Sequence, residues 1–259
     1  MKSRILPGLL FLCLGAFLAS KTSYVAGGSD SSGYLNAARL FTEGRVTERV
    51  EPLARFGLSD ARAPLFTPLG FTQAGRPGSI APSYPPGLPL HMAAAALLFG
   101  WKHAPFLVAP LASLVCLWLM YLVGRQLQLP PAFAAAGAAV LGFFPTFAAY
   151  SLQSMSDVPA TAWTLAAVLA ALRSRRSPHA AFLAGAAFAV AVLVRPTNAL
   201  LLAPLLAALP SRPGILARAA LGGLPLAALL LAYNAAAFGS PWRTGYGTLE
   251  GQMALGNFG

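Results

Sequence analysis

The chain has 259 residues, of which 57% are hydrophobic and only 10% are charged, and its mean hydropathy is +0.65. Soluble domains carry about 25% charged residues, so this composition excludes a water-soluble enzyme, a disordered chain and a secreted disulfide scaffold. The 18 Lys and Arg residues against 7 Asp and Glu residues give a net charge of +11. In a polytopic membrane protein, this excess predicts cytoplasmic anchoring and phosphate contacts rather than nucleic-acid binding.

Seven apolar stretches predict an all-α polytopic membrane protein with about seven transmembrane helices. In chain order they cover residues 5–19, 104–124, 131–150, 158–172, 180–194, 199–209 and 215–238. We interpret the first stretch as an uncleaved span, with a cleaved signal peptide as the alternative. The whole chain, 1–259, is expected to form a single membrane module.

A large first outer loop, 21–103, is expected between the first two spans. Within it, residues 30–44 predict an amphipathic helix that Asp30 or Ser31 can cap and Gly44 can end. Its apolar face carries Tyr34, Ala37, Ala38 and Phe41. The apolar stretch 87–99 is too short for a full span, so we expect a juxtamembrane helix that lies in the interface or dips partway into the membrane.

The distribution of arginine predicts the orientation of the bundle. With the N-terminus in the cytoplasm and 87–99 not crossing, the short inner loops hold the clustered basic residues, as the positive-inside rule requires. These residues are Lys2, Arg4, Arg125, Arg173, Arg175, Arg176, Arg212 and Arg218. All seven acids then lie outside, namely Asp30, Glu43, Glu48, Glu51, Asp60, Asp157 and Glu250.

Two of these acids, Asp30 and Asp157, each begin a helix at the outer mouth of the predicted bundle. Carboxylates that converge there can serve as a general base or as ligands of a divalent cation such as Mg²⁺ or Mn²⁺. The alternative is that both side chains are helix N-caps with no further role. No acid lies within a span, which argues against a proton relay.

Several segments together resemble the GT-C membrane glycosyltransferases, in the bacterial branch related to protein O-mannosyltransferases (glycosyltransferase family 39) and lipid A aminoarabinose transferases. The segments are Asp30-Ser31-Ser32-Gly33-Tyr34-Leu35, Tyr84-Pro85-Pro86-Gly87, Met155-Ser156-Asp157-Val158-Pro159, Arg195-Pro196-Thr197-Asn198 and Tyr233-Asn234 through Tyr246-Gly247. They occur in the same order and cover most of the chain. Protein O-mannosyltransferases have adjacent acids in the first motif, whereas Ser31 follows Asp30 here.

The resemblance implies a hexosyl or pentosyl transferase of the bacterial inner membrane, part of the cell-envelope machinery, with its active site on the outer face. The donor would be a polyprenyl-phosphate sugar, and the acceptor a lipid, glycan or protein. Asp30 would be the catalytic base or a metal-coordinating acid. Asp157 would orient the acceptor or share the divalent cation, for which the residues alone give no firm evidence.

The leaving lipid phosphate needs a positive partner. Arg195, Arg76 and Arg243 are the candidates, and Arg195 stands out because it ends an apolar helix at the outer interface. Its alternative role is a snorkelling side chain that fixes helix depth. Tyr34 and Tyr84 are candidates for the substrate pocket, with interfacial anchoring as the alternative.

Two other functions stay open from the sequence. A transporter or flippase of lipid-linked sugars would favour polar residues within spans or an internal repeat. A non-catalytic membrane subunit or inactive fragment is the third reading, because family members usually continue with more spans beyond the position of Asn257-Phe258-Gly259. The resemblance to the GT-C family covers its N-terminal catalytic module only.

Overall fold

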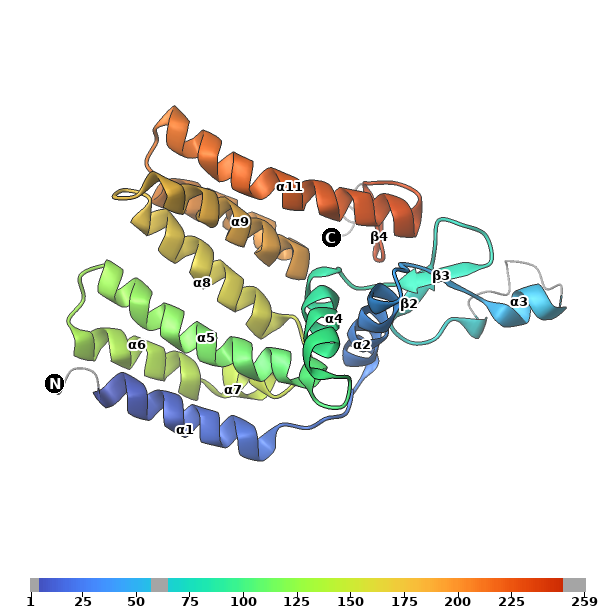
Figure 1. The fold of residues 1–259 in the computed structure, drawn as a ribbon, viewed down its shortest axis with the longest axis horizontal. Helices are drawn as coiled ribbons and strands as arrows, with labels where there is room; N and C mark the ends of the chain where they lie inside the picture. Colours follow the sequence, from blue (N-terminus) through green and yellow to red (C-terminus); the bar gives the residue numbers. More distant parts are fainter. Residues whose placement is uncertain (1–4, 57–64, 249–259) are drawn as a thin grey trace, which may run out of the picture.

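The computed structural model describes residues 5–56 and 65–248, which form a bundle of helices with a smaller layer across one end (Figure 1). The long bundle elements are α1 (Ile5–Lys21), α5 (Ala104–Gln126), α6 (Pro131–Phe143), α8 (Asp157–Arg173), α9 (Pro178–Val194) and α11 (Pro213–Phe238). The shorter ones are α7 (Pro145–Ser151), η3 (Pro196–Leu201) and α10 (Leu202–Ala208). Lys2, Arg4, Asp60, Glu250 and residues 257–259 lie outside the described residues.

Each apolar stretch predicted from the sequence is largely helical, with ends that differ by a few residues. The clearest difference falls within 131–150, which we predicted as one continuous span. The structure breaks it at Phe144, and α6 and α7 meet there at a bend of 67°. Phe144 is extended (φ −65°, ψ 120°) because the ring of Pro145 disfavours helical geometry in the preceding residue.

The helical membrane class is confirmed, whereas the number of seven spans is not. Among the described helices, α5 and α11 are long and apolar enough to cross a membrane, and α6 with α7 makes a third if the bent pair is one span. Three further helices, α1, α8 and α9, have 17 residues each. At 1.5 Å per residue each measures about 26 Å, slightly short of the ~30 Å hydrocarbon core.

The two ends of the bundle differ in chemistry. At one end, the late turns of α8 pack on the first turns of α9 and α11 through apolar residues such as Ala171, Ala181 and Ile215. The arginines at 173, 175, 176 and 212 flank these turns. At the other end, Ala160 of α8 and Val194 of α9 pack with Leu88. The acids at 30 and 157 lie at this second end, where Arg195 forms an ion pair with Asp157.

Glycines allow α9 and α11 to approach each other closely. A Cβ on Gly185 would overlap the carbonyl oxygen of Ala219, and a Cβ on Gly222 would overlap that of Phe182. Small residues at helix contacts are the main way in which membrane helices pack, because lipid supplies no hydrophobic force between them. The α9–α11 pair is therefore joined backbone to backbone.

We expect Gly185→Ala to destabilise the fold by about 1–3 kcal/mol, because the new methyl group forces the two backbones apart. Thermal unfolding of the purified protein in detergent measures this as a lower midpoint. Gly15→Ala in α1 is the matched control, since a Cβ there meets nothing within 4 Å. An unchanged midpoint for Gly185→Ala would contradict the close packing.

The layer across the bundle end comes from the predicted outer loop. It contains α2 (Ser29–Thr42), α3 (Glu51–Phe56), α4 (Gly87–Phe99) and three short strands, β1 (Glu48–Arg49), β2 (Phe71–Gln73) and β3 (Ser79–Pro82). Figure 1 shows α4 running across the bundle helices rather than alongside them. The helices over 30–44 and 87–99 are confirmed, and Gly44 ends the first in a left-handed conformation (φ +69°).

The antiparallel sheet, in the order β1-β3-β2, was not predicted. Its strands are short, and Ile80 and Val50 form a small buried cluster with Phe71 packed against it. Among the arginines nearby, Arg45 is exposed and forms ion pairs with Glu43 and Glu48. Arg39 instead lies over the ring of Trp101, 5.6 Å from its centroid.

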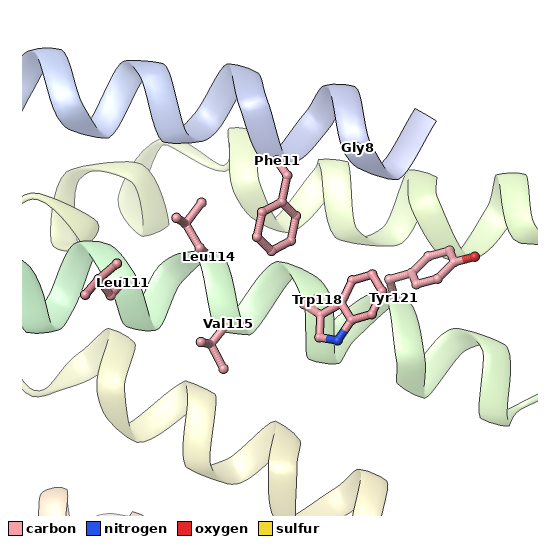
Figure 2. A pocket seen from close by; sticks show the side chains of 7 residues that line it. All are labelled: Gly8, Phe11, Leu111, Leu114, Val115, Trp118 and Tyr121. Atoms are coloured by element: carbon pink, nitrogen blue, oxygen red, sulfur yellow. The ribbon is translucent and has the colours of Figure 1, made fainter. Parts of the chain in front are cut away.

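An apolar groove of about 850 Å³ lies between α1 and α5 (Figure 2). Its lining residues are Gly8, Phe11, Leu111, Leu114, Val115, Trp118 and Tyr121. The tyrosine hydroxyl is the only titratable group among these lining residues. Such a surface suits contact with an apolar chain.

Candidate active site

Asp30 lies in the first turn of α2, and its carboxylate receives two hydrogen bonds. The Tyr84 hydroxyl donates to Asp30 Oδ1 at 2.6 Å, and the Ser29 hydroxyl donates to the same oxygen at 3.1 Å. The N-cap position is Gly28, which has no side chain to cap the helix. The prediction that Asp30 or Ser31 caps this helix is therefore wrong. Asp30 is free to act on something other than its own backbone.

Asp157 is the first residue of α8, and it forms an ion pair with Arg195. Arg195 follows the last turn of α9 in an extended conformation (φ −147°, ψ 103°). The capping position before α8 is Ser156, which makes no side-chain capping bond. As with Asp30, the N-cap alternative does not describe Asp157. The pair keeps 43% (Arg195) and 32% (Asp157) of its side-chain surface exposed, so a ligand can reach it.

Tyr34 connects the two acidic elements. Its hydroxyl donates to Ser156 Oγ at 3.1 Å, and its ring lies 4.8 Å from that of Tyr84 between centroids. Burial raises the pKa of Tyr34 to about 12, with the Ser156 hydrogen bond acting against this shift and the Asp30 charge adding to it. Arg195 acts on the same hydroxyl with the opposite sign. The charges of Asp30 and Arg195 therefore both influence the pKa of the Tyr34 hydroxyl.

Tyr84 keeps its proton for a related reason. Burial raises its pKa, and donating a hydrogen bond to the Asp30 carboxylate raises it further. The phenol therefore remains a donor to Asp30 at neutral pH. One oxygen of the carboxylate is thereby held in place while the other is available to a substrate.

Close backbone contacts fix these residues. Gly87 begins α4, and a Cβ there would overlap the backbone of Leu193 and Val194, directly before Arg195. A Cβ on Gly33 would overlap the ring of Tyr84. The two glycines thus set how close Tyr84 and Arg195 lie to α2 and α4.

The other predicted phosphate partners lie elsewhere. Arg76 is exposed in the turn between β2 and β3, where Gly75 N–H donates to Ala237 O at 2.9 Å and docks the turn on α11. Arg243 is exposed in β4 (Arg243–Thr244). No hydrogen bond or ion pair joins either arginine to Asp30, Asp157 or Arg195 in the described structure. Their role at a phosphate stays a prediction.

Sequence reasoning missed three neighbours of the site. Ser156 binds Tyr34, and Tyr246 lies beside Tyr84 with ring centroids 6.3 Å apart. On α4, His91 Nδ1 lies 2.7 Å from Gly87 O, and Trp163 Nε1 donates to His91 Nε2 at 2.9 Å, which joins α4 to α8. Ser156 and Tyr246 both stand within motifs that carried the resemblance, and that position was the available signal.

The donor set offers little to a divalent cation. Among the described residues, no three or more His, Cys, Asp or Glu side chains lie together in a group that could hold a metal ion. Of the two acids, Asp157 already has Arg195 as its positive partner. A divalent cation shared by Asp30 and Asp157 stays a prediction.

These observations define a helical membrane protein that holds a carboxylate, an ion pair and several tyrosines at one end of its bundle. The family model for dolichyl-phosphate-mannose-protein mannosyltransferase matches residues 83–239, and the chain belongs to this family. It is therefore a membrane glycosyltransferase of the GT-C type, in a family that uses lipid-linked sugar donors. No curated protein and no solved structure matches the chain.

The matched segment includes Tyr84, Asp157 and Arg195 but not two residues that lie near them in the structure. Asp30 precedes the matched segment and Tyr246 follows it. The Asp30 carboxylate nevertheless contacts the matched segment, because Tyr84 donates a hydrogen bond to it. The site is thus assembled from within and outside the matched region.

Proposed function

We propose that the protein transfers a hexose or pentose from a polyprenyl-phosphate donor to a hydroxyl acceptor on the outer face of the bacterial inner membrane. The observation that carries this proposal centres on Tyr34: its hydroxyl binds Ser156, the residue before the Asp157–Arg195 ion pair, and the charges of Asp30 and Arg195 both act on it. A base and a phosphate-binding cation are the two groups that this transfer requires. The family supports a lipid-linked donor.

Asp30 is the proposed base. As the acceptor oxygen bonds to the anomeric carbon, its proton passes to the carboxylate oxygen of Asp30. The bond between the anomeric carbon and the phosphate oxygen breaks, and its electron pair leaves with the polyprenyl phosphate. Tyr84 keeps the carboxylate in position through its hydrogen bond.

Arg195 is the proposed partner of the leaving phosphate. Its guanidinium presents several N–H donors, so it can bind Asp157 and a phosphate oxygen at the same time. Asp157 positions this guanidinium from the start of α8. The half-exposed ion pair lies at the end of α9, where a lipid headgroup would lie if the orientation predicted from charge holds.

The proposed activity is tested with purified full-length protein and a panel of polyprenyl-phosphate hexoses and pentoses. We expect sugar transfer to at least one lipid, glycan or peptide acceptor, measured with a radiolabelled sugar. The same protein in vesicles tests the flippase alternative. Movement of the lipid-linked sugar across the bilayer without transfer would contradict the proposal, as would absence of transfer from every donor.

We further propose that Arg195 replaces the divalent cation that the sequence suggested. Transfer activity should then change less than about two-fold after treatment with a chelator, because Asp157 already has its cation. Assays with and without EDTA, followed by addition of Mg²⁺ or Mn²⁺, measure this. Loss of activity that either metal restores would show that the acids bind a metal during turnover.

A further inference from the structure

The segment after α11 folds back over the candidate active site. It forms a hairpin from β4 and β5 (Gly247–Thr248), with Tyr246 at its turn. The Tyr246 ring lies 6.3 Å from the Tyr84 ring between centroids in an edge-on arrangement. Tyr246 is 60% exposed, so most of its aromatic surface faces no part of the described protein.

Several contacts hold this hairpin in place. A Cβ on Gly245 would overlap the backbone of Ser83, the residue before Tyr84. Within the turn, the Thr244 hydroxyl donates to Gly247 O at 3.1 Å and accepts from the Tyr246 N–H at 3.2 Å. At its base, Asn234 of α11 donates to Pro241 O at 3.1 Å. The exposed ring is therefore carried by a fixed backbone.

Tyr246 lies beside Tyr84, which binds Asp30, and it is within electrostatic reach of both charged groups of the site. Its pKa is raised by desolvation and then by the negative charge of Asp30, and it is lowered by the positive charge of Arg195. In the proposed reaction, the anomeric carbon must lie between the base and the phosphate. The sugar ring attached to that carbon therefore has to occupy the space near Asp30 and Arg195, beside Tyr246.

The other two tyrosines are less available to a sugar. Tyr34 is only 4% exposed, and its hydroxyl is bound to Ser156. The Tyr84 hydroxyl is bound to Asp30, and the Tyr34 ring packs against its own. Among the three, Tyr246 presents the largest open aromatic surface.

We propose that Tyr246 stacks against the sugar ring of the donor and contributes to donor recognition; this rests on the proposed function. The face of an aromatic ring carries partial negative charge, so it attracts the partially positive C–H hydrogens of a pyranose ring packed against it. The aromatic ring matters for this role, and the hydroxyl does not. Tyr246 is thus a specificity residue rather than a catalytic one.

The test compares the binding of a polyprenyl-phosphate hexose with that of polyprenyl phosphate alone, using the purified protein. We expect the parent protein to prefer the sugar-bearing lipid roughly ten-fold, and Tyr246→Ala to lose most of this preference. Tyr246→Phe should retain it, because the ring remains. In transfer assays, Tyr246→Ala should raise the KM for the donor about ten-fold and change kcat less than three-fold.

The exposed Trp242 on the same segment supplies the control. Trp242→Ala should leave the preference for the sugar unchanged. Equal preference in the parent protein and in Tyr246→Ala would overturn the inference, even if the parent transfers sugar. The binding assay decides the stacking role even if the parent protein transfers no sugar. Absence of transfer would contradict the proposed function and not the stacking role.

Discussion

Replacing Asp30 by asparagine is expected to lower kcat for sugar transfer by about 10²–10⁴-fold, the usual contribution of a general base. An asparagine oxygen can still accept the Tyr84 hydrogen bond, so the site should keep its shape. The amide cannot take the acceptor proton at neutral pH. The KM for the donor should change little, because Asp30 does not contact the phosphate in our proposal. Initial rates over a range of donor concentrations separate the two parameters.

Glu48→Gln is the matched control for this experiment. Glu48 is an acid of the same outer layer, but it lies on β1 in a surface ion pair with Arg45. Its neutralisation should leave transfer unchanged, since exposed pairs contribute about 0–1 kcal/mol to stability. Full activity of Asp30→Asn, with the parent protein active, would exclude Asp30 as the base.

Replacing Arg195 by glutamine is expected to lower kcat/KM by about 10²–10³-fold, as found when a group that stabilises developing charge is removed. Glutamine has no positive charge for the leaving phosphate. Arg195→Lys should recover part of the loss, because lysine keeps the charge but lacks the planar set of donors. The same kinetic assay measures each variant, and binding of polyprenyl phosphate alone should weaken in parallel.

Asp157→Asn distinguishes positioning from catalysis. If Asp157 acts through Arg195, the double variant should be no worse than Arg195→Gln alone, and the two effects should not add. Additive losses would show that Asp157 has a function of its own, such as orienting the acceptor. Equal activity of Arg195→Gln and the parent protein would favour the snorkelling role of Arg195.

The helices were largely predictable because apolar length and helix-ending residues are local properties. The range 87–99 agrees with α4 residue for residue, and Gly44 ends α2 as expected. The break at Phe144 could also have been predicted, because Pro145 is a local signal. The sheet formed by β1, β2 and β3 could not, since its strands are two to four residues long and pair across up to 32 positions of sequence.

The site was predictable in its charged residues and not in its connections. The resemblance placed Asp30, Asp157 and Arg195 in separate motifs. The ion pair arises only when α8 meets the end of α9, and the hydrogen bond from Tyr84 only when α2 meets the segment before α4. Helix capping seemed an adequate explanation for both acids, because position at a helix start is all that the sequence shows. Tyr246 was overlooked because nothing local in the sequence links it to Asp30, which lies 216 positions earlier.

The glycine contact between α9 and α11 has a consequence far from where it occurs. Arg195 follows the last turn of α9, and the hairpin that carries Tyr246 follows the last turn of α11. The close backbone contacts at Gly185 and Gly222 hold the two helices together as one unit. The Arg195 guanidinium and the Tyr246 ring are both attached to the ends of this unit. In the proposed site, the separation of Arg195 and Tyr246, and hence the size of sugar that fits between them, therefore depends on glycines that do not contact the substrate.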